Sequence, residues 1–297
     1  MSETAVALGD AAATDQPGSK EVGHFAASQG VQLHYHLHNA PAPRGGVLIL
    51  HGFAEHGGRY NHVIEALLPR GFSVMTYDHR GHGHSGGRRV FVERFGEYVA
   101  DAEVALELAV RRMPQPLYVL GHSMGGVVAL LLAAKRPPTV KGWILSNPAL
   151  HAAVAIPAWK VALARGASRA LPGLSVPSGI PPEHISRDAD EVRKYGDDQL
   201  NSKSATARWY TEFTSAQDEV LRDPQLLAGL PLLALIGEGD LIIDPKVSLQ
   251  FLGALAGPSV EVQRYPGLYH ELFNEIAEDR AKVFKDLVHW LQTRPAA

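Results

Sequence analysis

Apolar runs recur along most of the chain as short strands, each followed by a segment with helical spacing. The strands are expected at about 46–50, 73–77, 116–120, 142–146, 232–236 and 260–265. Strand and helix in regular alternation are typical of a parallel sheet that helices cover on both faces. Residues 31–38 instead alternate apolar and polar positions. This alternation predicts a strand with one solvated face, in an antiparallel hairpin at the edge of the sheet.

The strand pattern stops between Asn147 and about Asp223, where helical pieces are interrupted by prolines. This interruption predicts a cap inserted into the sheet domain. We therefore expect four segments: a disordered tail over 1–21, the first part of the α/β core over 22–148, a helical cap over 149–226 and the second part of the core over 227–297. Residues 152–165 at the start of the cap are unusually apolar. They either pack on the core or contact a lipid surface, as interfacial helices do.

A serine between small residues marks the most informative stretch of the chain. Residues 121–126 read Gly-His-Ser-Met-Gly-Gly, between the strand at 116–120 and an apolar helix that starts at about Ser123. Strand, sharp turn and helix around a G-x-S-x-G sequence are typical of a nucleophile elbow, which places the serine hydroxyl at the end of the sheet. A chance match is the alternative, and the flanking strand and helix disfavour it.

A serine hydroxyl is a weak nucleophile unless a base and a group that orients this base are present. His270 follows the last predicted strand and precedes the C-terminal helix, while Asp240 follows the strand at 232–236. The order Ser, Asp, His is the one expected for a hydrolase of the doubly wound α/β type. Asp218 and Asp244 are the competing acids. Asp218 has no strand before it, and Asp244 is placed to cap a helix.

Two backbone N–H groups that face the developing oxyanion are the third requirement of such a site. We expect one from Met124, directly after the nucleophile. The other is assigned to Phe53, in the loop after the strand at 46–50, because Gly52 lets that loop bend towards Ser123. Alternatively, the glycines of this loop only form a tight turn before the helix at 60–68.

These motifs together resemble the monoacylglycerol lipase and lysophospholipase group of α/β-hydrolases, from about residue 22 to the end of the chain. The resemblance rests on His51-Gly52, Glu55-His56, Arg59-Tyr60, the run Asp78-His79-Arg80-Gly81-His82-Gly83-His84-Ser85-Gly86, the elbow, and Tyr265-Pro266-Gly267-Leu268-Tyr269-His270-Glu271. It implies an α/β-hydrolase fold with a mobile helical cap. It also implies a triad of Ser123, Asp240 and His270, with the Phe53 and Met124 amides as the oxyanion hole.

The same resemblance implies that Glu55, Arg59 and Tyr195 are polar groups near the glycerol end of the pocket. Glu55 and Arg59 would alternatively pair with each other and brace the oxyanion loop, and we favour this role for Arg59. Two positions depart from the family pattern. Phe273 stands where some relatives carry a histidine, and residues 198–200 read Asp-Gln-Leu instead of Asp-Pro-Leu. The preference for acyl-chain length is therefore left open.

Charge and composition narrow the classes of partner. Lys and Arg number 28 against 31 Asp and Glu, so the chain has no basic excess with which to bind nucleic acid. The absence of cysteine fits the cytoplasm. We find neither a secretory signal pattern nor an apolar run long enough to span a membrane. His79, His82 and His84 are an alternative metal site, which we disfavour because no carboxylate accompanies them at ligand spacing.

The sequence therefore predicts a serine esterase that releases glycerol and a fatty acid from monoacylglycerols through an acyl-enzyme, with no metal or organic cofactor. Its expected partners are a lipid ester and, transiently, a membrane surface, and we predict a cytoplasmic location. A general carboxylesterase or lysophospholipase is the alternative of similar chemistry, ahead of a peptidase or thioesterase. A protein that binds an acyl ligand without turnover is an alternative of another class. The oligomeric state is not indicated.

Overall fold

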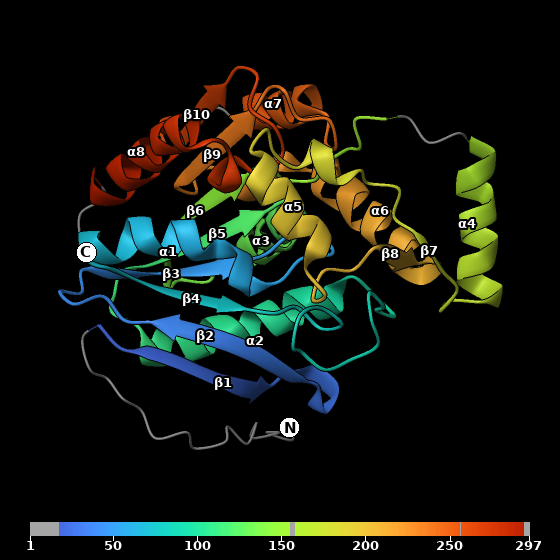
Figure 1. Ribbon diagram of the computed structural model, residues 1–297, viewed down its shortest axis with the longest axis horizontal. Helices are drawn as coiled ribbons and strands as arrows, with labels where there is room; N and C mark the ends of the chain where they lie inside the picture. Colours follow the sequence, from blue (N-terminus) through green and yellow to red (C-terminus); the bar gives the residue numbers. More distant parts are fainter. Residues whose placement is uncertain (1–17, 155–157, 256, 294–297) are drawn as a thin grey trace.

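The described part of the chain folds around an eight-stranded sheet, with helices on both faces (Figure 1). The computed structural model describes residues 18–154, 158–255 and 257–293. The strand order is β1-β2-β4-β3-β5-β6-β9-β10. The strands are β1 (Lys20–Ala26), β2 (Gln32–His38), β3 (Gly45–Leu50), β4 (Phe72–Tyr77), β5 (Leu117–His122), β6 (Val140–Ser146), β9 (Leu232–Gly237) and β10 (Val260–Tyr265).

The pairing of the strands follows the prediction from the hydrophobic pattern. β3, β4, β5, β6, β9 and β10 run parallel, whereas β1 and β2 form an antiparallel hairpin whose second strand pairs with β4. The predicted α/β-hydrolase fold and the edge hairpin are confirmed. Lys20 and Glu21 belong to β1, so the predicted tail over 1–21 is wrong for these two residues. Residues 1–17 of that tail lie outside the described residues.

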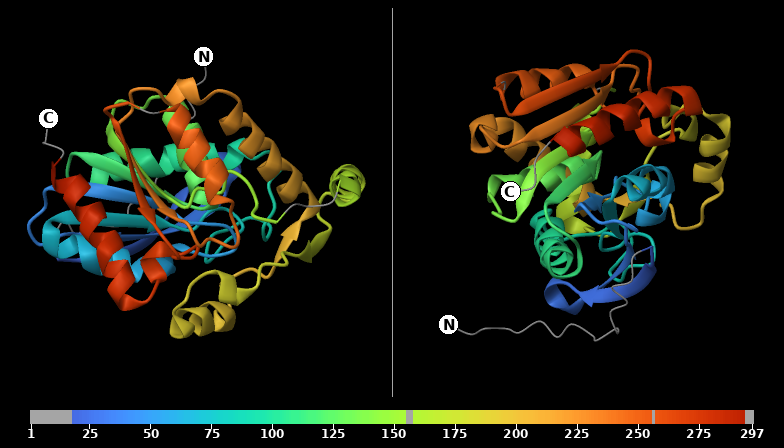
Figure 2. Two further views of the ribbon diagram at one scale, coloured as in Figure 1. Left: turned by 90° about the horizontal axis from the view of Figure 1, so that it is seen from above. Right: turned by 90° about the vertical axis from the view of Figure 1, so that its left-hand side faces the viewer.

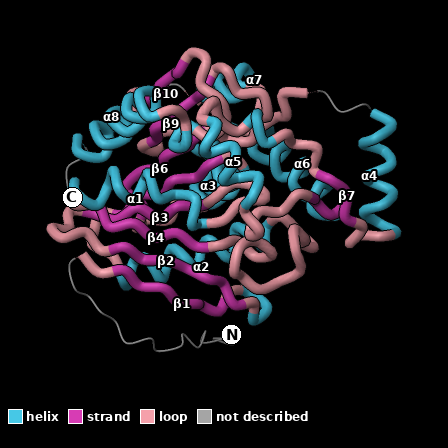
Figure 3. The backbone as a smooth tube through the Cα atoms, viewed as in Figure 1, coloured by secondary structure: helices cyan, strands magenta, loops and turns pink. Residues whose placement is uncertain are grey.

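Each face of the sheet packs against its own set of helices (Figures 2 and 3). Alternate residues of β3 show the division, since Val47 and Ile49 join one apolar cluster and Leu48 and Leu50 join the other. The first cluster includes residues of α1 (Asn61–Leu67) and α8 (Ala277–Thr293). The second includes residues of α2 (Gly96–Arg112), α3 (Met124–Ala134) and α7 (Pro245–Ala254). Both faces of the parallel strands are therefore buried, as their continuous apolar sequences require.

The segment between β6 and β9 contains helices, as the sequence predicts, together with a small two-stranded sheet that we did not anticipate. Its elements are α4 (Ala158–Ala170), β7 (Ser175–Pro177), α5 (Ala189–Asp197), β8 (Ser204–Thr206) and α6 (Ala207–Arg222). α6 lies against the core through buried residues such as Trp209 and Val220. α4 contacts α6 and stands at the outer side of the molecule (Figure 2).

The apolar start of this segment is largely exposed. Trp159 and Leu163 of α4 are 65% and 66% exposed, so packing on the core does not account for them. Residues 155–157 of the predicted run lie outside the described residues. Among the residues with described structure, no helix is long and apolar enough to cross a membrane.

Several buried and half-buried histidines bear on the stability of the fold in acid. Burial lowers the pKa of seven histidines, to about 4 for His36 and His82 and to about 3 for His79. The others are His34, His38, His51 and His122. The unfolded chain binds more protons at these sites below their ordinary pKa of 6.5, so protonation favours unfolding. Fewer groups act in the opposite direction, among them Glu55, Asp101 and His270, whose pKa is raised.

We predict that the free energy of unfolding falls as the pH drops from 6.5 towards 4. Urea unfolding at pH 7.5 and at pH 5 measures this, and the midpoint should lie at lower urea at pH 5. His36→Gln removes one titrating group and should make the loss smaller. A midpoint that stays constant or rises on acidification would contradict the prediction.

Candidate active site

Three residues far apart in the sequence meet at the carboxyl edge of the parallel strands. His270 Nε2 lies 2.9 Å from Ser123 Oγ, and His270 Nδ1 lies 2.6 Å from Asp240 Oδ2. Ser123 follows β5, Asp240 follows β9 and His270 follows β10. Parallel strands end at one edge of the sheet, which is why three separate loops converge there. All three residues are buried.

The acid of this constellation is distinguished by its contacts. Asp240 Oδ1 accepts hydrogen bonds from the amides of Ile242 and Ile243, at 2.8 and 2.9 Å, which leaves Oδ2 for the histidine. Asp244 instead caps α7, accepting from the amide of Lys246. Asp218 belongs to α6. The structure thus brings Asp240, of the three sequence candidates, to His270.

Ser123 sits in the strained turn that the sequence predicts. Its φ of 52° and ψ of −118° lie outside the regions that a serine ordinarily occupies. The Ser123 amide donates to the carbonyl of Ser146, and the Ser123 carbonyl accepts from the amide of Ala149, both at 3.0 Å. A Cβ at Gly125 would lie 2.0 Å from the Leu50 carbonyl oxygen, so only glycine allows α3 to start so close to β3.

The loop after β3 runs directly beside the nucleophile. A Cβ on Gly52 would lie 3.2 Å from Ser123 Cβ, and the Gly52 amide donates to Glu55 Oε1 at 2.5 Å. The ring of Phe53, the next residue, packs on Trp209 of α6 with 4.3 Å between ring centroids. Within the described parts of the chain, the amides of Phe53 and Met124 donate to no protein acceptor. No hydrogen bond within these described parts competes for either amide.

The surroundings of His270 suit a general base. Burial by itself lowers the pKa of His270, but the Asp240 carboxylate and, to a smaller extent, Glu271 and Glu55 outweigh burial and raise it. The His122 ring lies 4.8 Å away, centroid to centroid, and its own pKa is well below the ordinary value because of burial. A neutral His122 adds no opposing charge near neutral pH.

A buried ionic network adjoins the triad. Arg59 Nη2 donates to Glu271 Oε2 at 2.5 Å, and Arg59 Nε lies 3.4 Å from Glu55 Oε2. The guanidinium also lies over the Tyr195 ring, 4.9 Å from its centroid. Burial and the charge of Glu271 raise the pKa of Glu55 to about 6, while Arg59 acts to lower it. Arg59 thus pairs with Glu55 and with Glu271, and its role in bracing the loop stays a prediction.

The segment between β6 and β9 narrows the cavity at the triad. Its walls include Ser123, His270 and Glu55, with Ile180, Ile185 and Tyr195 from the cap side. Its volume is about 30 Å³, whereas sites for drug-sized ligands measure roughly 300–1,000 Å³. An acyl chain does not fit unless some of these cap residues move aside.

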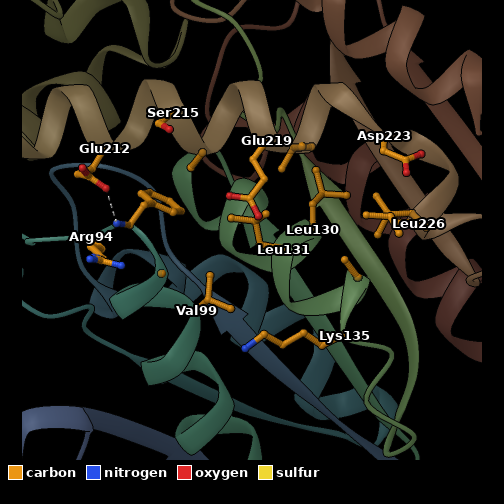
Figure 4. A pocket seen from close by; sticks show the side chains of 16 residues that line it. Arg94, Val99, Leu130, Leu131, Lys135, Glu212, Ser215, Glu219, Asp223 and Leu226 are labelled. Carbon is orange, nitrogen blue, oxygen red and sulfur yellow. Dashed lines mark hydrogen bonds between the residues drawn. The ribbon is translucent and has the colours of Figure 1, made fainter. Parts of the chain in front are cut away.

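A second cavity of about 480 Å³ lies between α2, α3 and α6. In Figure 4 its floor is formed by apolar residues that include Val99 and Leu130, and charged residues such as Glu219 and Lys135 line it. It shares no lining residue with the triad cavity and contains no histidine. Without a histidine base for its one serine, Ser215, we assign it no part in the reaction.

The histidine-rich run 78–86 does not converge on one point. His79 packs on His51 at 4.3 Å, and His82 lies 6.4 Å from His79, whereas His84 packs on His34 at 5.0 Å. Among the described residues, no group of three or more His, Asp or Glu is arranged to hold a metal ion. Asp78 fastens neighbouring turns, accepting from the amides of Gly57 and His84.

Sequence reasoning missed several residues of this site. Glu271 was part of a quoted motif, yet nothing in the sequence pairs it with Arg59, 212 positions earlier. Ile180 and Ile185 lie in a proline-rich segment whose path periodicity does not predict. Asn147, whose side-chain amide donates to the His270 carbonyl at 2.8 Å, directly follows β6, and that position at a strand end was the signal in the sequence that pointed to it.

We predict that Arg59→Met destabilises the protein strongly, because it leaves Glu55 and Glu271 buried without a cation. Breaking one side of a buried ion pair typically costs about 3–5 kcal/mol. Urea unfolding of both proteins measures the difference, and Arg59→Lys, which keeps a charge, should lose less. A loss below about 1 kcal/mol for Arg59→Met, a size typical of exposed pairs, would show that the network does not brace the loop.

Comparison with known proteins places these features in context. The family model described as "Serine aminopeptidase, S33" matches residues 41–277. The chain is 34% identical over 271 residues to the monoacylglycerol lipase of Mycolicibacterium smegmatis, covering 90% of this chain and 95% of that protein. It is 29% identical to phospholipase YtpA of Bacillus subtilis, covering 83% of this chain and 94% of that protein.

A solved structure is similar to this chain over most of its length. The crystal structure of monoacylglycerol lipase from Paleococcus ferrophilus has a TM-score of 0.78 to this chain, at 28% identity. The match covers 89% of this chain and 99% of that one. The similarity therefore extends over most of the chain.

Proposed function

This chain belongs to the serine aminopeptidase S33 family of hydrolases, and from that premise we propose that it cleaves monoacylglycerols to glycerol and a free fatty acid. The observation that carries the proposal is the chain of hydrogen bonds from Ser123 through His270 to Asp240 beneath a cap. The relative from M. smegmatis carries the name monoacylglycerol lipase. The proposed reaction is ester hydrolysis through an acyl-enzyme.

The proposed mechanism follows from the geometry. His270 Nε2, 2.9 Å from Ser123 Oγ, takes the hydroxyl proton while the oxygen attacks the ester carbonyl. Asp240 keeps the ring oriented through Nδ1 and stabilises the imidazolium. The Phe53 and Met124 amides receive the oxyanion. His270 then protonates the departing glycerol oxygen, and water repeats the sequence to release the fatty acid.

The head group would lie against the ionic network. Glu55 and Tyr195 line the cavity, so they are the polar side chains that we assign to the glycerol hydroxyls, with Arg59 bracing them from behind. Two carboxylates and one guanidinium leave a net negative charge there once Glu55 is ionised. Such a charge favours an uncharged glycerol over a phosphorylated head group.

Related ester substrates form the second candidate. The similarity to a B. subtilis phospholipase supports a lysophospholipase. A triad beside a pocket that selects little among head groups would be consistent with a general carboxylesterase. The negative network disfavours the first of these. A peptidase, although named in the family description, has less support, because the relatives matched over most of the chain carry the names monoacylglycerol lipase and phospholipase. A binding protein without turnover would have no use for the aligned base and acid.

We predict a clear preference for monoacylglycerol in initial rates on a matched panel. The panel contains a monoacylglycerol, a diacylglycerol, a triacylglycerol, a lysophospholipid with the same acyl chain and a short p-nitrophenyl ester. Ser123→Ala is the control and should lose nearly all turnover, since removal of the nucleophile typically costs about 10⁶-fold in kcat. Cleavage of the short ester alone would reject the lipid assignment, and a lack of any cleavage would favour the binding protein.

We also propose that the protein is cytoplasmic and meets its substrate at a membrane surface through α4. Trp159 and Leu163, one helical turn apart, are exposed, and Leu171 and Leu174 beyond the helix are exposed as well. Helices with such an apolar face lie in the membrane interface, where tryptophan is favoured. The exposed Arg169 lies beside this face on the same helix, where it would reach anionic head groups.

We expect Leu163→Ser to weaken binding to vesicles of mixed neutral and anionic phospholipid, measured by sedimentation. Hydrolysis of a water-soluble p-nitrophenyl ester should stay unchanged, because Leu163 is remote from the triad cavity. Val22→Ser, at an exposed apolar position on β1, is the matched control. Equal vesicle binding by both variants and the wild type would refute the role of α4.

A further inference from the structure

Asn147 contacts the backbone that carries the base and the backbone that leads to the acid. It follows the last residue of β6, is 3% exposed, and adopts a φ of 40°, in the left-handed region that asparagine tolerates better than most residues. Its side-chain amide donates to the carbonyls of Tyr269 and His270, at 3.1 and 2.8 Å. Its Oδ1 accepts from the amide of Gly237 at 2.8 Å.

These three bonds connect the base to the acid. His270 is the base itself, and Gly237 is the last residue of β9, three positions before Asp240. The Asp240 amide in turn lies 3.4 Å from the Gly237 carbonyl. A single buried side chain therefore fixes the distance between the backbone that carries the histidine and the backbone that carries the acid.

The nucleophile is held by the backbone on either side of the same residue. Ser146, before Asn147, accepts from the Ser123 amide, and Ala149, after it, donates to the Ser123 carbonyl. The Asn147 amide also donates to the Leu235 carbonyl at 3.0 Å, which anchors residues 146–149 to β9. Serine, histidine and acid are thus positioned from one four-residue segment.

We propose that Asn147 is a positioning residue for catalysis, which sets the alignment of His270 with Ser123 and Asp240. The chemistry of the site requires this residue type. Two carbonyls need donors and one amide needs an acceptor, and a short carboxamide supplies both. Aspartate offers no donor, and serine offers a single hydroxyl. This role rests on the proposed function of the triad and adds a residue that touches neither the substrate nor the reacting atoms.

Asn147→Gly is the direct test, because glycine accepts the positive φ and removes only the side chain. We expect kcat on a p-nitrophenyl ester to fall at least tenfold while KM stays within threefold, since Asn147 does not line the triad cavity. The acidic limb of the pH profile should move to lower pH. The reason is that weaker pairing with Asp240 leaves the effect of burial, which lowers the pKa of His270, less opposed. The other groups near His270, namely Glu271, Glu55 and the neutral His122 ring, are unchanged in this variant.

Asn147→Asp keeps the shape and the acceptor for Gly237, so it serves if the glycine variant does not fold. Its carboxylate would face two carbonyl oxygens, and we expect a similar loss of kcat. Buried opposite two carbonyl oxygens, this carboxyl group takes up a proton and donates to one carbonyl only. The acidic limb should therefore move to lower pH, by less than in the glycine variant. A loss of kcat with a displaced limb in both variants is not expected from a merely structural residue.

Ser73→Ala is the matched control for lost stability. Ser73 is buried in β4, and its hydroxyl accepts a hydrogen bond from the backbone amide of Ala40, away from the triad. It should lower the melting temperature with kcat and the pH limb unchanged. Wild-type kcat retained within twofold in the Asn147 variants would overturn the proposal, as would a loss of kcat without any movement of the limb. An inactive wild-type protein would reject the proposed function instead.

Discussion

Ser123 holds a backbone conformation that the surrounding packing alone makes tolerable, and the catalytic arrangement depends on it. A φ of 52° with a ψ of −118° aims the side chain away from both the strand and the helix that it joins. Such strain typically costs about 1–3 kcal/mol and persists only where neighbours over-determine it. Here those neighbours are the Ser146 carbonyl, the Ala149 amide and the close approach of β3 at Gly125. The core of the sheet therefore stabilises a serine that faces a cleft.

From that point the remaining site follows from the topology. β5, β9 and β10 end at the same edge, so a base and an acid on later loops reach the serine without any special path of the chain. Burial then strengthens the electrostatics of the triad, because Asp240 acts on His270 with little water between them. The same burial closes the site, and the cap residues Ile180, Ile185 and Tyr195 have to yield before a substrate enters.

The sequence predicted the parts of this site that local patterns encode. The elbow at Ser123, the strand before His270 and the buried strand before Asp240 each have a recognisable local signature, and the structure brings all three residues together. The parallel sheet and its edge hairpin were predicted for the same reason. The roles of these residues in catalysis, and of Phe53 and Met124 as oxyanion donors, stay predictions until they are measured.

Features made by contacts between distant segments were beyond sequence reasoning. The Arg59–Glu271 pair and the three bonds of Asn147 join loops that periodicity does not relate. The closed cavity depends on how a proline-rich segment folds back on the core, which no repeating pattern describes. The β7–β8 sheet is likewise too short for its alternation to be read. The end of the predicted tail was misplaced because β1 has few apolar residues. Its residues before Phe25 are exposed or half-buried, and Phe25 is its first buried residue.

The covalent intermediate tests the account most directly. The protein is mixed with a p-nitrophenyl ester whose acyl group is released slowly from the enzyme. The reaction is quenched in acid during turnover, and the protein is examined by intact-protein and peptide mass spectrometry. We predict one acyl group per chain, located on Ser123. Steady hydrolysis of the ester with no acyl adduct at Ser123, or with the adduct on another residue, would contradict the assignment of Ser123 as the nucleophile.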